Sequence, residues 1–250
     1  MGEAESEGKR GERSDMKIDV SKHNTDNFAP YIDQDAEMLD LTRLTQLHPI
    51  KRYSLDAIQR RFGIDIPQAW EKIFDLGRHY GVKFVIAGGA VRDWIMGIFS
   101  DKEPEITDID LFFFSEEDRV KFQFALEAGG GEVAKDNERV TNVQYCGCLV
   151  QLIKSFTYES PEHVIATFDF SVSQFAVSPV DDELYFYFGT PSLKDVKNRK
   201  LRINQITFPV STMRRLLKYS RKGFYICNGV MLQVAHAVVR APELAGLYVD

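Results

Sequence analysis

The sequence is poor in cysteine and lacks any long hydrophobic run. Three Cys among 250 residues argue against a disulfide framework and fit a reducing cytosol. No apolar run approaches the roughly 18 residues that a membrane span needs. The charged start of the chain, residues 1–15, has no apolar stretch of the kind that a signal peptide requires. We therefore expect a cytoplasmic protein with no membrane partner.

An excess of positive charge is also missing. The chain has 31 Lys+Arg against 37 Asp+Glu and a formal net charge of -6, which excludes a generally basic nucleic-acid coat protein. The charges are unevenly spread, however. Eight acidic residues and one basic residue lie between positions 101 and 118, and ten basic residues and one acidic residue lie between 194 and 222. Two solvated surfaces would explain this pattern, and so would a carboxylate cluster that holds cations beside a basic surface that binds phosphates.

The chain is expected to form four parts. Residues 1–15 have no aromatic or aliphatic anchor and predict a disordered tail. Residues 16–80 are expected to be a helical N-terminal extension, in which Ser54 caps one helix and a later helix ends near Gly81. Residues 81–208 are expected to be the head domain, and residues 209–250 a basic helical neck. The apolar residues expected on one face of the later helix in the extension are Trp70, Ile73, Phe74 and Gly77.

Strands and helices alternate in the head domain. Short apolar or β-branched runs predict strands, and longer periodic runs with capping residues predict helices. The helix that follows Ser115 is expected to turn Val120, Phe124 and Ala128 inward. The expected fold class is therefore α+β, a mixed sheet flanked by helices. The expected strands are Val82–Ala87, Ile106–Phe114, a hairpin over Thr141–Lys154, Val164–Val177 and Leu184–Phe188.

Two glycines between the first strand and its helix are the first candidate for chemistry. Gly88 and Gly89 have no side chains, so their backbone can approach a phosphate closely, and the helix N-terminus adds N–H donors. Arg92 follows one turn later and could contact a phosphate or pair with a carboxylate. The motif is neither a dinucleotide-binding fingerprint nor a P-loop, because no Gly-Lys-Ser/Thr follows.

Two aspartates in the next strand are the second candidate. Asp108 and Asp110 are two residues apart, so their side chains lie on the same strand face, while Ile109 and Leu111 point into the core. Two carboxylates that close repel one another unless a cation lies between them. Mg²⁺ prefers such oxygen ligands and commonly bridges carboxylates to phosphates. The pair therefore predicts a magnesium site beside the glycine turn.

The segments GGAVRDWIMG and TDIDLFFF together resemble the head domain of CCA-adding enzymes and bacterial poly(A) polymerases, within the nucleotidyltransferase superfamily. The resemblance implies that Gly88, Gly89, Arg92 and Asp93 serve the incoming triphosphate, and that Asp108 and Asp110 bind metal. Three looser segments extend the resemblance over roughly residues 70–225. These segments are Phe168–Val172, Ser192–Arg202 and Arg215–Arg221.

The sequence departs from this family at three places. Gln151 stands where the family has an acidic residue, so Asp169 is expected either to supply the third catalytic carboxylate or to be a buried structural acid. Ser173 replaces an Asn of the segment that begins at Phe168. The Glu-Asp pair that helps the family to choose between C and A falls near Ser211 and Thr212, so base choice stays open.

The pattern favours a Mg²⁺-dependent nucleotidyltransferase that moves a nucleoside monophosphate from ATP or CTP to an acceptor hydroxyl. Arg215, Lys218 and Arg221 share one helix face and are expected to bind nucleotide or line the acceptor path. RNA or another polyanion is the favoured acceptor, and a protein side chain or a small molecule stays open as an alternative. Two alternatives stay open: a catalytically weak NTP- or RNA-binding module of the same fold, and an interaction role carried by residues 16–80. Oligomeric state is not predicted.

Overall fold

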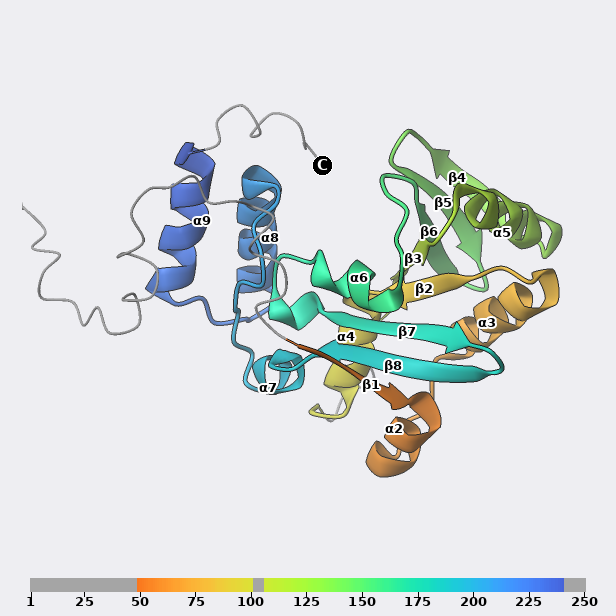
Figure 1. The fold of residues 1–250 in the computed structure, drawn as a ribbon, viewed down its shortest axis with the longest axis horizontal. Helices are drawn as coiled ribbons and strands as arrows, with labels where there is room; N and C mark the ends of the chain where they lie inside the picture. Colours follow the sequence, from red (N-terminus) through yellow and green to blue (C-terminus); the bar gives the residue numbers. More distant parts are fainter. Residues whose placement is uncertain (1–48, 101–105, 241–250) are drawn as a thin grey trace, which may run out of the picture. The chain divides into compact units, whose positions relative to one another are not determined.

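A mixed sheet of eight strands forms the centre of the structure (Figure 1). The structure, a computed structural model, describes residues 49–100 and 106–240. Neighbouring strands are antiparallel except β3 and β6, which run parallel, and the order is β1-β8-β7-β2-β3-β6-β5-β4. The predicted α+β class is confirmed. The strands are β1 (Ile50–Ser54), β2 (Phe84–Ala87), β3 (Asp108–Phe113), β4 (Glu132–Asp136), β5 (Val140–Tyr145), β6 (Cys148–Ile153), β7 (Phe175–Val180) and β8 (Glu183–Gly189).

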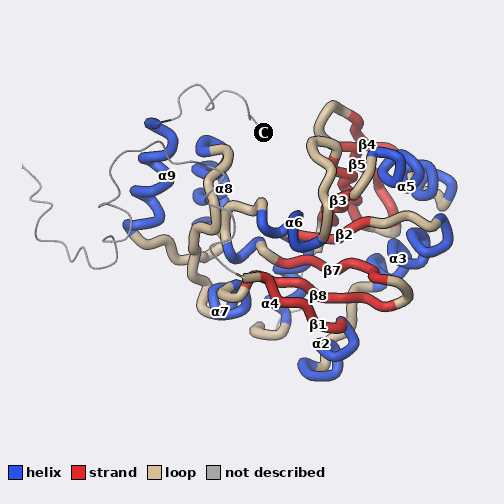
Figure 2. Tube along the Cα trace, in the orientation of Figure 1, coloured by secondary structure: helices blue, strands red, loops and turns tan. Residues whose placement is uncertain are grey.

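Helices cover both faces of the sheet (Figure 2). On one face α3, α4 and α5 pack against the larger core, which includes Phe84 and Leu111. On the other face α6 packs Val164 and Ile165 against Val85. Helices α8 and α9 pack against each other, and their buried residues, which include Tyr219 and Val234, belong to the larger core. The helices are α2 (Leu55–Phe62), α3 (Gln68–Tyr80), α4 (Gly89–Gly97), α5 (Glu116–Ala128), α6 (Pro161–Ala166), the 3-10 turn η3 (Ser171–Ser173), α7 (Ser192–Lys197), α8 (Pro209–Arg221) and α9 (Asn228–Arg240). Within the described ranges, no helix is both long and apolar enough to cross a bilayer.

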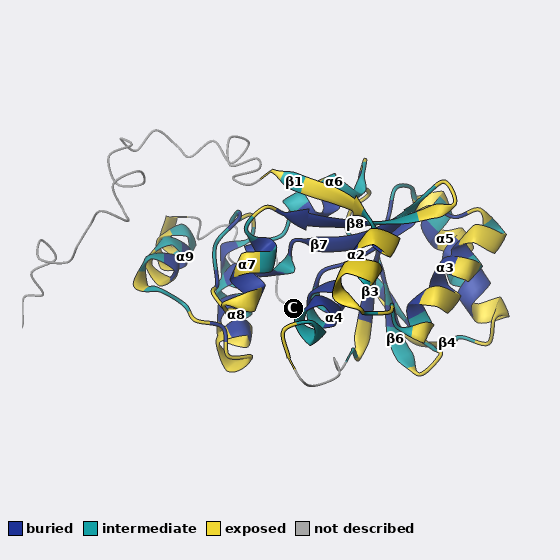
Figure 3. Cartoon of the chain, turned by 90° about the horizontal axis from the view of Figure 1, so that it is seen from below, coloured by how far each residue is buried: buried dark blue, intermediate teal, exposed yellow. Residues whose placement is uncertain are grey.

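Helix α3 follows its sequence pattern closely. The four residues predicted to share its inner face, from Trp70 to Gly77, are all buried, and the outer face is exposed (Figure 3). A Cβ on Gly77 would lie 2.3 Å from the ring of Phe84, so only glycine allows the helix to approach β2 this closely. Gly81 ends the helix in the left-handed conformation, with φ of 62°. This predicted helix is confirmed.

The predicted orientation of α5 is wrong. Its N-terminus is as expected, because the Ser115 hydroxyl accepts a hydrogen bond of 3.1 Å from the backbone N–H of Asp118. Val120 and Phe124, however, are 52% and 65% exposed. A second set of apolar residues on the same helix faces the sheet instead, so packing against the core, and not the helical period alone, selects the inner face. The buried apolar residues of α5 are Phe122, Ala125 and Leu126.

Two further predictions need correction. The strand expected over Val164–Val177 is a strand only from Phe175, because Ser160 caps a helix at the backbone N–H of His163, and Pro161 provides its first residue. The extension expected to be helical over 16–80 contains strand β1, which pairs with β8. Most of that extension and the whole predicted tail, residues 1–15, lie outside the described residues.

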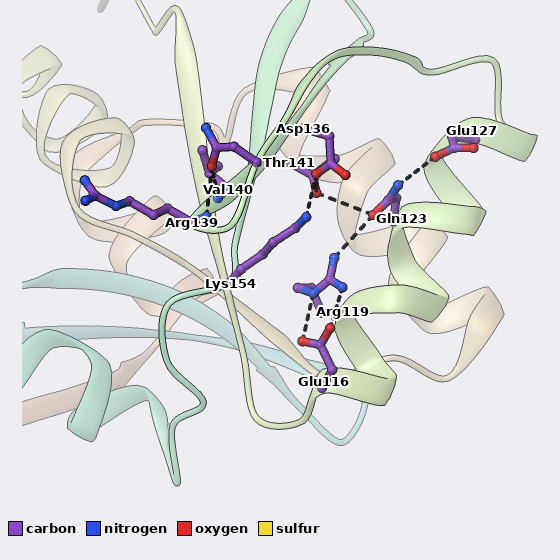
Figure 4. Close-up of polar contacts among 10 residues, drawn as sticks. Glu116, Arg119, Gln123, Glu127, Asp136, Arg139, Val140, Thr141 and Lys154 are labelled. Atoms are coloured by element: carbon purple, nitrogen blue, oxygen red, sulfur yellow. Dashed lines mark hydrogen bonds and ion pairs between the residues drawn. The ribbon is translucent and has the colours of Figure 1, made fainter. Parts of the chain in front are cut away.

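A polar network holds the outer strands to α5 (Figure 4). Arg119 binds both oxygens of Glu116 and also donates to Gln123. Asp136 in turn accepts a hydrogen bond from Thr141 and pairs with Lys154. Because the network joins α5, β4, β5 and β6 with mutually satisfied partners, we interpret it as structural support for this end of the sheet. The hydroxyl of Thr141 also lies 3.5 Å from Gln123.

Candidate active site

The two aspartates lie together at the start of β3. Ile109 and Leu111, which alternate with them, are fully buried in the larger core. The strand period therefore directs Asp108 and Asp110 to the opposite face, the one that α6 partly covers. Asp108 is exposed and Asp110 is half-buried. This arrangement gives one strand face two adjacent carboxylates, with one of them open to solvent.

The glycine turn lies directly beside this pair. Gly88 joins β2 to α4 with φ of 81°, a conformation that favours glycine. Its N–H donates to the carbonyl of Phe175, which ties the turn to β7. A Cβ on Gly88 would lie 3.8 Å from both Oδ2 of Asp110 and the ring of Phe168. The structure thus brings the predicted phosphate turn and the predicted metal ligands to one place.

The electrostatics of the pair suit a cation. Burial, followed by the negative charge of Asp108, raises the pKa of the Asp110 carboxyl to about 7, and the charges of Lys218 and Arg92 act in the opposite direction. Two hard oxygen donors on one face fit Mg²⁺. Across residues 49–100 and 106–240, no group of three or more acidic, His or Cys side chains is arranged to hold a metal ion.

Arg92 does not reach outward toward a phosphate. It is 3% exposed, and its Nε and Nη2 each donate to the Asp93 carboxylate at 2.8 Å. Its Nη1 donates to the hydroxyl of Tyr219 at 3.1 Å. These contacts match the pairing with a carboxylate that was one of the two roles predicted for Arg92. Its role toward the triphosphate stays a prediction. Arg92 and Asp93 form an ion pair next to the glycine turn. Nζ of Lys222 lies 3.5 Å from Oδ2 of Asp93.

The Asp169 carboxylate binds two residues of helix α8. Its carboxylate accepts hydrogen bonds from Nε of Arg215 at 2.5 Å and from the hydroxyl of Thr212 at 3.0 Å. Its backbone carbonyl accepts from the N–H of Asn204. These contacts favour the structural alternative for Asp169, because its charge is compensated by a guanidinium. They also turn Arg215 away from the nucleotide role that was predicted for it.

Of the three predicted basic residues on α8, Lys218 is the one whose positive charge lowers the pKa of the Asp110 carboxyl, against the larger effects of burial and of Asp108. Its side chain is exposed. Arg221 lies one turn further along the exposed surface of α8, and no described contact links it to the aspartates. The basic helix therefore contributes one cation to the acidic pair and uses another, Arg215, to attach itself to the head.

Sequence reasoning missed two residues that border the site. Phe168 packs against Phe112 with ring centroids 5.7 Å apart and also touches the Gly88 turn. Tyr219 binds Arg92, as described above. An aromatic residue in an otherwise basic helix segment was the available signal for Tyr219. For Phe168 the signal was its place at the start of Phe168–Val172, one of the segments that carry the resemblance.

Gln151 occupies the neighbouring strand at the level of Asp110. The parallel pairing of β3 and β6 puts the two residues in register. The amide nitrogen of Gln151 donates to Oδ1 of Asn142 on β5 at 3.3 Å. A neutral amide therefore stands next to Asp110, at the position where the resembling family has an acidic residue.

Solved structures with a similar fold are nucleotidyltransferases. A tRNA-processing enzyme in its apo form is 20% identical, with a TM-score of 0.55 over 71% of this chain and 49% of that chain. A CCA-adding enzyme in complex with CTP is 16% identical, with a TM-score of 0.57 over 77% and 47%. The Thermotoga maritima CCA-adding enzyme in complex with tRNA is 17% identical, with a TM-score of 0.57 over 76% and 46%. The predicted nucleotidyltransferase-like fold is confirmed, although this chain spans only about half the length of these proteins.

At the level of sequence, the chain matches a protein-family model. No curated protein matches the chain. A family model does match, however, over residues 63–199, which include β2, the glycine turn, both aspartates of β3 and Asp169. Because the match covers more than half of the chain, the chain belongs to the Gabija anti-defense 2 family.

Proposed function

We propose that this protein is a divalent-metal-dependent nucleotidyltransferase, which transfers a nucleoside monophosphate from an NTP to an acceptor hydroxyl and releases pyrophosphate. The observation that carries the proposal is the approach of the Gly88 turn to the Asp110 carboxylate. A phosphate-binding turn and a pair of metal-binding carboxylates are the two parts that phosphoryl-group chemistry requires in one place.

Each residue of the site has a proposed role. Asp108 and Asp110 would hold Mg²⁺, which neutralises charge on the phosphates and the leaving pyrophosphate when it is bound. The backbone N–H of Gly89, at the start of α4, would donate to the triphosphate. Gly88, whose own N–H is bound to Phe175, would allow the phosphate to approach because it has no side chain. Lys218, whose charge acts on Asp110, would add a positive charge near the phosphates. Arg221 is a proposed contact for the more distant part of the nucleotide or for the acceptor.

Proposals for the nucleotide and the acceptor rest on charge and on related folds. Structures of the same fold are described with ATP, with CTP and with tRNA, which supports ATP or CTP as donor and RNA as acceptor. The exposed basic residues between 194 and 222 support a polyanionic acceptor. They are Lys194, Lys197, Arg199, Lys200, Arg214, Lys218, Arg221 and Lys222.

An incorporation assay tests the enzymatic proposal. The protein is incubated with Mg²⁺, each labelled NTP and a mixture of cellular RNA, and label transfer and pyrophosphate release are measured. We expect activity in the wild type and a loss of at least 100-fold in Asp108→Asn and Asp110→Asn. Glu117→Gln removes an exposed carboxylate from the first turn of α5 and is the matched control. Activity that survives the double aspartate change would refute the assignment.

A second candidate is a nucleotide-binding module without turnover. It is favoured by Gln151, a neutral residue in register with Asp110. Such a module would bind Mg²⁺ and an NTP in a calorimetric titration and release no pyrophosphate. The same titration in Asp110→Asn would then lose its Mg²⁺ dependence.

The family name describes a role against a defence called Gabija, and we propose this biological role for the chain. Cells that carry the Gabija defence would lose their protection when this protein is produced. The Asp108→Asn/Asp110→Asn variant separates two routes to that effect. A variant that still blocks the defence indicates a binding role, and an inactive variant indicates that nucleotidyl transfer is required.

A further inference from the structure

Tyr219 lies at the centre of a buried polar cluster that the proposed chemistry does not use. The residue is 7% exposed. Its hydroxyl accepts a hydrogen bond from Nη1 of Arg92 at 3.1 Å and shares a second, of 2.5 Å, with the hydroxyl of Ser173. The guanidinium carbon of Arg92 also lies over its ring, 5.2 Å from the centroid. Phe170 and Phe224 pack edge-on against the same ring and fix its position.

Arg92 connects this cluster to the glycine turn. Its backbone N–H donates to the carbonyl of Gly88 at 3.0 Å. Its Nη2 lies 3.7 Å from the position that a Cβ on Gly89 would take. The guanidinium therefore packs behind the turn, and its direction is set by two partners, Asp93 on one side and Tyr219 on the other. Asp93 follows Arg92 on the same helix, so among the described hydrogen bonds of the guanidinium the one to Tyr219 ties it to a different element.

That element is α8, and a second attachment fixes its N-terminal half. Thr212 and Arg215 both donate to the carboxylate of Asp169. Thr212 and Tyr219 are seven residues apart, about two helical turns, so the helix is attached at two points along its length. Lys218 immediately precedes Tyr219. A helix held at both points fixes the position of the backbone from which this lysine projects.

We infer that Tyr219 is a positioning residue: its hydroxyl couples the basic helix α8 to the Gly88–Gly89 turn, so that the turn and Lys218 meet a triphosphate in a fixed geometry. The inference rests on the proposed function. Without the hydroxyl, Arg92 keeps its pair with Asp93 but loses its tie to α8, and the turn and the lysine can move independently. Binding of a nucleotide would then have to restore an arrangement that the wild type already has.

The test is Tyr219→Phe, which removes the hydroxyl and keeps the ring, its aromatic neighbours and its place over Arg92. We expect binding of ATP and of CTP in excess Mg²⁺, measured by calorimetry well below the melting temperature, to weaken about tenfold. Ser173→Ala is the matched control. It removes the other partner of the same hydroxyl and leaves the Arg92 contact intact, so nucleotide affinity should stay within about twofold of the wild type.

The experiment distinguishes a failure of the role inferred for Tyr219 from a failure of the proposed function. Unchanged affinity in Tyr219→Phe would overturn the inference, and so would an equal loss in Ser173→Ala, because the effect would then belong to the cluster as a whole. The double variant Tyr219→Phe/Ser173→Ala removes both hydroxyls of the pair, so neither is left without the other. If Tyr219→Phe alone folds poorly, nucleotide affinity is measured in this double variant and compared with that of Ser173→Ala. A wild type that binds neither nucleotide would refute the proposed function itself, whereas a wild type that binds both and is matched by Tyr219→Phe refutes only the role of Tyr219.

Discussion

Gly88 and Asp110 face each other at the point where β2 ends and β3 begins. Ala87 pairs with Asp110 across the two strands, and a Cβ on Gly88 would lie 3.8 Å from the Asp110 carboxylate. The sequence separates the two residues by more than twenty positions, and the antiparallel strand pair brings them together. Any ligand held between turn and carboxylate must fit the space that the missing side chain leaves.

Gly88→Ala should therefore damage both the backbone and the site. With φ of 81° and ψ of -126°, the residue has a conformation that alanine rarely adopts, which costs about 1–3 kcal/mol of folding free energy. The added methyl group would also lie between the turn and Asp110. We expect a lower melting temperature and a loss of Mg²⁺-dependent nucleotide binding, measured by thermal unfolding and calorimetry.

Gly89→Ala is the control for this change. Gly89 begins α4, and its Cβ would meet only Nη2 of Arg92 at 3.7 Å, an ordinary contact. Alanine should be tolerated there and should stabilise the helix by up to about 1 kcal/mol. Equal damage from both substitutions would contradict the assigned geometry of the turn.

The acidity of Asp110 predicts how metal binding depends on pH. Its pKa is raised to about 7, mainly by burial, so a proton competes with Mg²⁺ at this carboxylate below neutral pH. We expect the affinity for Mg²⁺ to rise up to tenfold per pH unit below pH 7 and to level off above it. Calorimetry in the presence of ATP from pH 5.5 to 8.5 measures this. A flat profile would contradict the prediction.

The same carboxylate should reduce the stability of the metal-free protein. A carboxyl whose pKa is raised by folding is destabilising once it ionises, so stability should fall as the pH rises from about 4 toward 7 and stay low above it. Asp110→Asn removes this charge. We expect the variant to melt at a higher temperature than the wild type at pH 8 and at a similar temperature at pH 5, in the absence of divalent metal. A variant that melts lower than the wild type at pH 8 would contradict the raised pKa.

Gln151→Glu should strengthen the metal site. The new carboxylate would stand on the strand next to Asp110, about 5 Å away in the direction of the sheet hydrogen bonds. We expect Mg²⁺ to bind at least tenfold more tightly and the metal-free protein to be less stable, because a third anion joins the pair. Gln144→Glu, on an exposed position of β5, adds the same charge further from Asp110 and should change neither property. Similar effects of both variants would show that Gln151 is not adjacent to the site.

Local patterns in the sequence were enough to predict several structural features. The inner face of α3, from Trp70 to Gly77, follows from the helical period, and Gly81 ends the helix as expected. The alternation around Asp108 and Asp110 likewise follows from the strand period. These features depend on neighbours within a few residues along the chain, where periodicity is informative.

Other features depend on partners far away in the sequence. Helix α5 has two overlapping apolar stripes, and only the sheet decides that Phe122 faces inward and Phe124 outward. Strand β1 is polar and gains its structure from β8, more than 130 residues later. In the site, the sequence could not reveal that Arg215 is bound to Asp169, 46 residues away, while Lys218 acts on Asp110. Such pairings follow from tertiary packing and not from spacing.

The contacts of Asp169 lead to the last prediction. Asp169→Asn would remove the anion of an ion pair in which the Asp169 side chain is buried and the Arg215 side chain is 37% exposed. This loss should cost about 2 kcal/mol of folding free energy and about 4–8 °C in melting temperature. Because this carboxylate is bound to α8, Mg²⁺ affinity should stay within about twofold of the wild type. Asp182→Asn, on the exposed turn after β7, is the control for loss of a negative charge and should leave the melting temperature unchanged. Loss of Mg²⁺ binding at an unchanged melting temperature would instead restore Asp169 as the third catalytic carboxylate.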